Sequence, residues 1–179
     1  VLQGSSPPLP VGSEFQVNSY TTNLQNTAAV SLAANGDFVV VWPSSGSDGD
    51  TSEFSVQGQR YSAAGVPQGA QFQINSYTTG DQLSPEIVAN AAGDFVVVWH
   101  SRYQDGSLYS VFGQRYASSG APLGPEFRAT TYTTQRQRHP SVAADASGNF
   151  VVVWDSDFQD GSGAGVFGQR YASSGAPLS

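Results

Sequence analysis

The sequence predicts an all-β protein made of three copies of one four-stranded unit. The segment FVVVW occurs three times and ends at Trp42, Trp99 and Trp154, which are 57 and 55 residues apart. The motifs YTT and GQRY recur with similar spacing, and the thirteen residues at 111–123 and 166–178 are identical. No segment keeps the 3.6-residue apolar period of a helix, so repetition and β-branched residues together indicate a repeat protein of strands.

Each unit is expected to contain four strands, and the third unit shows them most clearly. A short first strand at 141–143 leads through the turn DASGN into a second strand at Phe150–Trp154, which is a typical hairpin pattern. The polar loop DSDFQDGSGAG precedes a third strand at Val166–Tyr171, and ASSGAPL forms the next turn. The expected fourth strands have the pattern Glu-Phe-x-Val-Asn or a variant of it: Glu14–Asn18, Gln71–Asn75 and Glu126–Thr130.

The second strand is apolar on both faces. Phe38, Val40 and Trp42 point to one side and Val39 and Val41 to the other, because side chains alternate along a strand. A strand of this kind has to be covered on both sides, as it is when sheets stack face to face. FVVVW is therefore predicted to be core rather than a repeated chemical site.

We expect residues 1–179 to form one repeat domain with β-propeller-like blades. The units span approximately 19–75, 76–130 and 131–179, and residues 12–18 are expected to supply the fourth strand that the last unit lacks. Exchange of this strand between chains would give a ring or a filament. A single-chain threefold β-trefoil or β-prism is the structural alternative.

The composition argues against nucleic acids and membranes as binding partners. The net charge is −7, all seven basic residues are Arg, and Cys and Met are absent. Nucleic-acid binding needs clustered positive charge, so we expect no nucleic-acid partner. No apolar run approaches the ~20 residues that span a bilayer, so no membrane insertion is expected. The abundance of Gly, Ser, Thr, Asn and Gln favours a secreted location, extracellular or at the cell surface.

The repeated motifs resemble a family of bacterial secreted tandem-repeat proteins that are often attached to hemolysin-type calcium-binding tails. The third unit matches best, with Gly148 to Trp154 followed by Gln159-Asp160-Gly161-Ser162-Gly163 and then Gln169-Arg170-Tyr171. The first unit departs from the pattern, with Ser47 where the others have Gln. The resemblance implies secretion and association with a surface or matrix, and it implies no reaction and no catalytic residue.

The acidic residues of the loops are the candidate metal ligands. Asp48, Asp105 and Asp160 each follow a repeated Trp by six residues and precede Gly. Carboxylates in Gly-containing loops suit calcium, although Asp-Gly pairs also form ordinary turns, and the turn interpretation is preferred. The full candidate set, with calcium as the ion, is Asp48, Asp50, Asp105, Asp155, Asp157 and Asp160.

Arg60, Arg115 and Arg170 occupy one position of the repeat. An Arg guanidinium pairs well with a carboxylate, so we expect each to form a structural ion pair, with the loop Asp as the most uniform partner.

Aromatic and amide side chains in the loops suggest a sugar-binding surface, because a ring can stack on sugar C–H groups while polar atoms bind hydroxyls. The candidate ligand-binding residues are Tyr103, Gln104, Asp105, Tyr109, Phe158, Gln159 and Asp160.

Catalysis is not expected from the sequence. His100 and His139 occupy different repeat positions, so no repeated His pair or triad is present. The predicted function is a non-enzymatic, multivalent binding or adhesion module, with cell-surface or matrix glycans as the candidate partners. A structural protein that self-associates through terminal strands is one alternative, and a hydrolase with two converging carboxylates is another.

Overall fold

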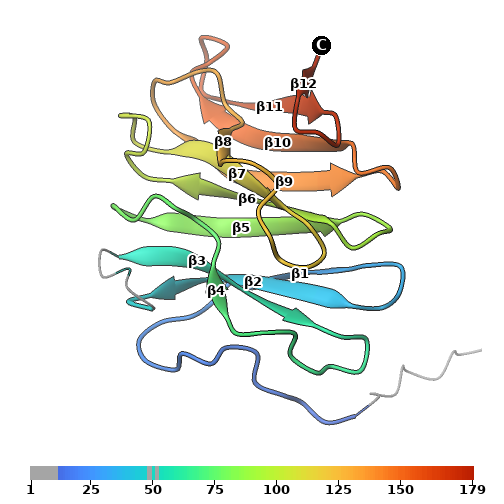
Figure 1. The fold of residues 1–179 in the computed structure, drawn as a ribbon. Helices are drawn as coiled ribbons and strands as arrows, with labels where there is room; N and C mark the ends of the chain where they lie inside the picture. Colours follow the sequence, from blue (N-terminus) through green and yellow to red (C-terminus); the bar gives the residue numbers. More distant parts are fainter. Residues whose placement is uncertain (1–11, 48–49, 51–52) are drawn as a thin grey trace, which may run out of the picture.

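The chain folds into three four-stranded antiparallel sheets, which we call blades 1, 2 and 3. The computed structural model describes residues 12–47, 50 and 53–179. Its described part contains strands but no helix, and therefore no helix that could span a membrane. The sheets lie face to face in one stack, with blade 1 at one end and blade 3 at the other (Figure 1). This arrangement confirms the β-propeller-like blades and not the threefold trefoil or prism.

Each blade follows chain order from its first to its fourth strand. Blade 1 contains β1 (Ala29–Leu32), β2 (Phe38–Ser45), β3 (Phe54–Tyr61) and β4 (Phe72–Gln73). Blade 2 contains β5 (Gln82–Ala89), β6 (Phe95–Ser101), β7 (Ser110–Tyr116) and β8 (Phe127–Arg128). Blade 3 contains β9 (Gln137–Ala144), β10 (Phe150–Asp157), β11 (Ala164–Tyr171) and β12 (Pro177–Leu178). The first strand of blade 3 is thus longer than the predicted 141–143, and β4 and β8 are shorter than the predicted 71–75 and 126–130.

The acidic or amide residue before each FVVVW joins two turns of its own blade. Asp37 Oδ1 accepts a hydrogen bond from Ala63 N (2.9 Å), and Asp94 Oδ1 accepts one from Ser118 N (2.9 Å). Asn149 Oδ1 makes the same contact with Ser173 N (3.1 Å). The hydrogen bond from Ala63 holds the pKa of Asp37 below its usual range. Thus the residue preceding FVVVW connects the first hairpin turn to the turn after the third strand.

The two faces of each FVVVW strand pack against different neighbours. Val39 and Val41 of blade 1 share a core with Phe95, Val97 and Trp99 of blade 2. The opposite face of blade 2, including Val96 and Val98, packs against Phe150, Val152 and Trp154 of blade 3. Each blade therefore presents its Phe-Val-Trp face to the preceding blade and its Val-Val face to the following one, which confirms FVVVW as core.

The predicted ion pairs of the repeated Arg residues are wrong. Arg60 Nη1 donates to the carbonyl of Ser118 in blade 2 (2.7 Å), and Arg115 Nη1 donates to the carbonyl of Ser173 in blade 3 (2.7 Å). The guanidinium reaches the neighbouring blade because Arg lies on the Val-Val face, opposite Val39 or Val96 in the register. These residues hold adjacent blades together through backbone carbonyls.

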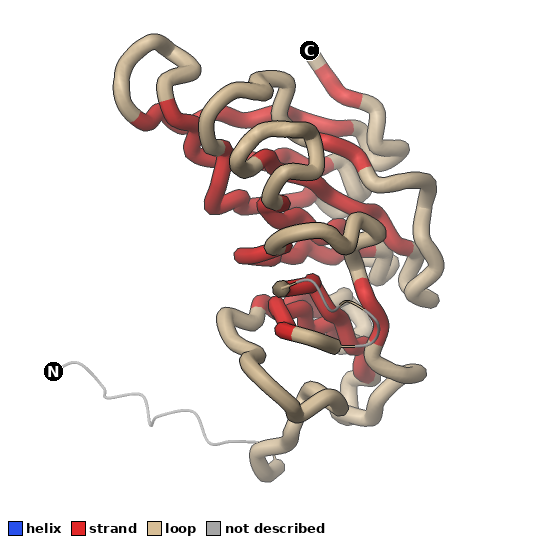
Figure 2. The backbone as a smooth tube through the Cα atoms, turned by 90° about the vertical axis from the view of Figure 1, so that its left-hand side faces the viewer, coloured by secondary structure: helices blue, strands red, loops and turns tan. Residues whose placement is uncertain are grey.

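Residues 14–18 lie on blade 1. Phe15 packs against Tyr61 with ring centroids 5.5 Å apart, and Tyr61 Oη donates to the carbonyl of Val17 (2.8 Å). In this chain the fourth strand of blade 3 is β12, which lies at the other end of the stack (Figures 1 and 2). Residues 12–18 therefore do not complete blade 3 of their own chain, and their exchange between chains stays a prediction.

Candidate active site

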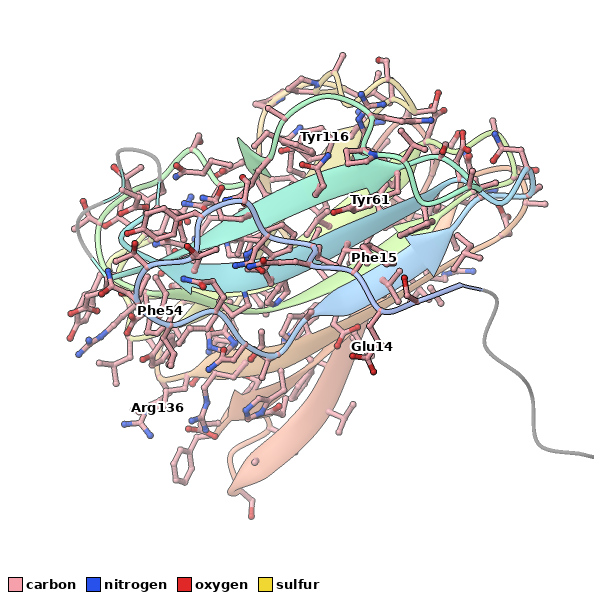
Figure 3. All side chains as sticks on the ribbon, turned by 90° about the horizontal axis from the view of Figure 1, so that it is seen from below. Glu14, Phe15, Phe54, Tyr61, Tyr116 and Arg136 are labelled. Carbon is pink, nitrogen blue, oxygen red and sulfur yellow. The ribbon has the colours of Figure 1, made fainter. Side chains whose placement is uncertain are left out.

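Paired charged side chains lie at one end of the sheets, which we call the loop end. Here the loops that join the second strand to the third in each blade meet the starts of β5 and β9. Figure 3 shows Phe54 and Arg136 at this end, away from Tyr61 and Tyr116. All ion pairs between described residues lie here: Arg102–Glu53, Arg102–Asp81, Arg128–Asp105, Arg138–Asp157 and His139–Asp155.

A repeated Gln fixes the start of the first strand in each blade. Gln82 and Gln137 are fully buried. Their side-chain amides donate to the carbonyls of Thr79 (3.2 Å) and Thr134 (2.7 Å), three residues earlier. Gln25 makes the same contact in blade 1. A buried amide held in this way restricts the backbone, so the polar residues next to each Gln have a defined position.

Asp81 lies immediately before β5 and forms a cluster with Glu53 of blade 1. Arg102 Nη1 is 3.6 Å from Glu53 Oε2 and 3.7 Å from Asp81 Oδ2. Arg102 N also donates to the Asp81 carbonyl (2.8 Å), so the three residues are joined through backbone and side chains. Burial raises the pKa of Asp81, and a side-chain hydrogen bond with Glu53 raises it further. Asp81 therefore retains its proton to higher pH than an ordinary aspartate.

Tyr103 supports this cluster from the outside. The Arg102 guanidinium lies 4.7 Å from the centroid of the Tyr103 ring, and its Nη2 donates to Tyr103 Oη (3.1 Å). This hydrogen bond raises the pKa of Arg102, which stays positively charged beside the two carboxyl groups. Sequence reasoning missed the cluster because Glu53, Asp81 and Arg102 do not recur at equivalent positions of the three units.

A second cluster brings together the two His residues. His139 Nδ1 lies 2.8 Å from Asp155 Oδ1, and the His100 and His139 rings are 6.1 Å apart between centroids. His139 has φ 50° and follows the last paired residue before an irregularity between β9 and β10. This kink lets residues from different repeat positions meet, which the repeat spacing could not predict.

The environment of His100 strongly favours its neutral form. His100 is buried, and it contacts the edge of the Tyr109 ring at a centroid distance of 5.2 Å. Burial is the main cause that lowers its pKa to about 4, and the nearby His139 and Arg138 add to the effect.

The predicted sugar-binding residues are divided between two loops. Tyr103 and Phe158 occupy the same position in blades 2 and 3 and have φ values of 65° and 60°. Each begins a tight turn, closed by Gly106 N to the Tyr103 carbonyl (3.1 Å) and Gly161 N to the Phe158 carbonyl (3.0 Å). Their aromatic rings are therefore carried by turn residues at two separate positions in the stack.

The remaining predicted sugar contacts have partners within the protein or lie beside these turns. Gln104 Nε2 donates to Glu126 Oε2 (3.0 Å), and Tyr109 packs against His100. Gln159 and Asp160 belong to the blade 3 turn, where Asp160 Oδ1 accepts a hydrogen bond from Ser162 N (3.1 Å). No single cleft formed by both loops emerges from these contacts.

The predicted calcium ligands are likewise distributed over the blades. Asp105 binds Ser110 Oγ (2.6 Å) and Arg128 Nη1 (3.3 Å), and its other oxygen accepts from Ser107 N, as expected for a turn residue. Asp155 and Asp157 face His139 and Arg138 respectively.

Blade 1 contributes the other two residues of the predicted calcium set. Asp50 is buried and accepts a hydrogen bond from Gln73 (3.4 Å), whereas Asp48 lies outside the described residues. Within the described ranges, no three His, Asp or Glu side chains are grouped so that they could hold a metal ion. Calcium binding stays a prediction.

The stack of four-stranded blades defines a protein of the β-propeller type, and solved structures share this fold. An endo-arabinase from Bacteroides thetaiotaomicron is similar over 87% of this chain, with a TM-score of 0.52 and 14% identity. An α-L-arabinofuranosidase from Lactobacillus brevis is similar over 91%, with a TM-score of 0.54 and 13% identity. An endo-1,4-β-xylanase from Bacteroides thetaiotaomicron is similar over 87%, with a TM-score of 0.51 and 8% identity.

These likenesses show the fold. The chain spans only 56%, 57% and 58% of the three enzymes in turn, a little over half of each. No protein-family model matches the sequence, and no curated protein matches it significantly.

The structural neighbours correct the functional expectation. The sequence predicted a non-enzymatic binding or adhesion module, but solved structures with this fold are named as glycoside hydrolases. The prediction considered only residues at equivalent repeat positions. The loop end instead brings together unlike residues from adjacent blades, as Glu53, Asp81 and Arg102 illustrate.

Proposed function

We propose that this chain forms part of a glycoside hydrolase and that the Glu53–Asp81 pair is its proton donor. The observation that carries the proposal is that two carboxyl groups from adjacent blades flank one guanidinium: Arg102 Nη1 lies 3.6 Å from Glu53 Oε2 and 3.7 Å from Asp81 Oδ2. Burial raises the pKa of Asp81, and the neighbouring Glu53 raises it further. Asp81 is therefore the carboxyl group that keeps a proton for the glycosidic oxygen.

The chemistry of the pair fits the acid step of glycoside hydrolysis. A general acid must be protonated before it donates to the leaving oxygen, and burial with a neighbouring carboxyl group is a common way to keep it so. Arg102, which contacts both carboxyl groups, compensates the negative charge that remains after the proton leaves.

Arabinose- and xylose-containing polysaccharides are the proposed substrate class. The fold is shared with enzymes named for arabinan, arabinofuranoside and xylan substrates, and this likeness supports the choice. A secreted location, favoured by the absence of Cys and the abundance of Gly, Ser, Thr, Asn and Gln, belongs to the same proposal because such polymers are found outside the cell.

The test is release of reducing sugar from arabinan and xylan by the 179-residue chain and its variants. We expect Asp81→Asn and Glu53→Gln each to lower kcat at least about 100-fold, the scale of a lost general acid. Activity of the unsubstituted chain should decrease as pH rises, since Asp81, whose pKa is raised, then loses its proton. Asp145→Asn is the matched control, because Asp145 lies in the hairpin turn at the opposite end of the sheets.

Two outcomes would overturn the proposal. One is an absence of sugar release by the unsubstituted chain from either polymer. The other is an equal loss in Asp81→Asn and Asp145→Asn chains with unchanged thermal stability, because a proton donor would affect only the first.

A further inference from the structure

The outer face of blade 3 is open and partly apolar. It carries Val151, Val153 and Val166, together with Arg170 opposite Val151 and Asp155 opposite Val166, and it is turned away from blade 2. Val166 is 81% exposed, whereas Val111, at the same repeat position in blade 2, is fully buried against blade 3. An exposed sheet face of this kind normally has a partner. The contacts between the blades of this chain indicate which partner fits.

One contact between adjacent blades is made by an Arg and a Gly-containing turn. Arg60 crosses over Gly120, and Arg115 crosses over Gly175. A Cβ atom on either Gly would come within 2.9 Å and 2.6 Å, respectively, of the Arg Nε. Both Gly residues have φ of +86°. Gly can occupy this position because it has no side chain to clash and readily adopts positive φ.

At opposite ends of the stack, one Arg and one Gly-containing turn have no counterpart to complete this contact. In blade 3, Arg170 donates through Nη2 to the carbonyl of Ser179 (2.6 Å), and its Nη1 has no cross-blade acceptor among the described residues. In blade 1, Gly65 has φ +76° and no atom of the described chain near its Cβ position. Arg170 lacks a turn to cross, and Gly65 lacks an Arg above it.

A second contact places the Phe of β4 and the Phe of β8 over a Gly of the third strand of the same blade. The Phe72 ring lies over Gly58, and the Phe127 ring lies over Gly113 so closely that a Cβ atom there would be 2.6 Å away. Gly168, the equivalent residue of β11, has only Val153 and a backbone oxygen beside it.

Residues 14–18 provide the missing Phe. Phe15 is 54% exposed, although it packs on Tyr61 as Phe72 packs on Tyr116. The hydrogen bond from Tyr61 Oη to the Val17 carbonyl (2.8 Å) corresponds to that from Tyr116 Oη to the Ile74 carbonyl (2.9 Å). Residues 14–18, which form no strand in this chain, are therefore already seated on blade 1 where the fourth strand of a preceding blade would lie (Figure 3).

The hydrogen-bonding edge of β11 matches this strand. The carbonyl of Val56 accepts from Ile74 N (2.8 Å), and that of Val111 accepts from Ala129 N (2.8 Å). The corresponding carbonyl of Val166 has no such donor among the described residues. Beside residues 14–18, Val17, Val40 and Trp42 line a hollow of about 220 Å³, on the face where an incoming Val would contact Trp.

We infer that a second copy of this chain docks on the outer face of blade 3 through its own blade 1 and residues 14–18. Phe15 of one copy lies opposite Gly168 of the other, and Gln16 lies opposite Phe167, in the register that β4 and β8 adopt within the chain. Arg170 donates to the carbonyl of Ala63, and Val166 packs beside Trp42. The contact continues the blade-to-blade interface that occurs twice in one chain. It does not depend on the proposed hydrolysis.

Sedimentation of the 179-residue chain over a concentration series tests the association. We expect dimers or larger species, with Val166→Asp and Phe15→Ala each weakening association at least about tenfold, the scale of one lost interface anchor. Leu108→Asp is the matched control, because Leu108 is 39% exposed in a loop of blade 2, which is not part of the proposed contact between blade 3 and blade 1. A chain that stays monomeric at about 100 μM, well above the micromolar affinities of ordinary interfaces, would overturn the inference.

Paired cysteines test the register, and the chain has no Cys of its own. Chains with Phe15→Cys and chains with Gly168→Cys are mixed under mild oxidation and separated without reductant. Directly opposite residues of antiparallel strands are ~5.5 Å apart at Cα, which a disulfide can span. We expect covalent pairs containing one chain of each variant. Pairs of like chains in equal amount would contradict the head-to-tail contact.

Discussion

Blades 2 and 3 contain the same thirteen-residue segment in two different environments. Residues 111–123 and 166–178 are identical, yet β7 is almost fully buried, whereas β11 alternates between exposed and partly buried positions. The difference is the neighbour: β7 lies between blades 1 and 3, and β11 is covered on one face only (Figure 1). Burial in a stacked repeat protein is therefore decided by position in the stack and not by the residues of the repeat.

The FVVVW strands show the same difference. All residues of β6 are buried. In β10, Phe150, Val152 and Trp154 are buried against blade 2, whereas Val151 and Val153 on the other face are not. A repeat with two apolar faces thus leaves one of them uncovered wherever the stack of blades ends.

The largest expected effect is a difference in the free energy of unfolding between substitutions at Val111 and at Val166. Val111→Asp places a carboxylate in a fully buried site without a partner and is expected to lower the free energy of unfolding by about 3–5 kcal/mol. Val166→Asp, at the same repeat position in blade 3, should change it by less than about 0.5 kcal/mol in the monomer. Urea unfolding at low protein concentration measures both values. Similar losses in the two variants would mean that blade 3 is covered in solution.

The next largest effect is a pH dependence of stability that arises from His100 in blade 2. The pKa of His100 is about 4 in the folded chain against an ordinary value of 6.5. Below pH 6.5 the unfolded chain binds a proton at this residue that the folded chain does not. Stability should therefore fall from pH 6.5 to pH 4, by up to about 3 kcal/mol. The equivalent residue in blade 3 is Asp155, which is only partly buried.

His100→Gln checks this assignment, because Gln is polar but does not titrate. Unfolding experiments at pH 4, 5, 6 and 7 should give a flatter stability profile for the variant than for the unsubstituted chain. The carboxyl groups titrate in both proteins, so their contribution cancels in the difference. Parallel profiles would place the origin of the pH dependence elsewhere.

The smallest effect compares Arg115 with Arg170. Arg115 joins blade 2 to blade 3 through the Ser173 carbonyl, whereas Arg170 contacts only the Ser179 carbonyl of its own blade. Arg115→Ala should lower the free energy of unfolding by about 1 kcal/mol, and Arg170→Ala by less than about 0.5 kcal/mol. Thermal unfolding of the two variants side by side would measure the difference. A larger loss for Arg170→Ala would contradict the role assigned to the cross-blade hydrogen bond.

Local patterns in the sequence predicted the strands and turns, but not the partners of polar side chains. The turn before Phe150 and the core role of Trp99 follow from residue type and alternation, which act over a few residues. The acceptor of Arg115 could not be predicted in this way, since it is a backbone carbonyl of the next blade. The meeting of His139 with His100 depends on a backbone irregularity that recurs two residues after the repeated Gln, but the two His residues occupy different repeat positions, so their contact across blades could not be predicted from the repeat.

The sequence by itself determined that the protein is a threefold repeat of four-stranded sheets with FVVVW in the core. Repetition and alternation are properties of the chain, and apolar residues on both faces of a strand require two covering layers. Only the tertiary structure decided which face is left open, and which unlike residues meet at the loop end. Those outcomes depend on the packing of one blade against the next, because each blade contributes only half of every contact between them.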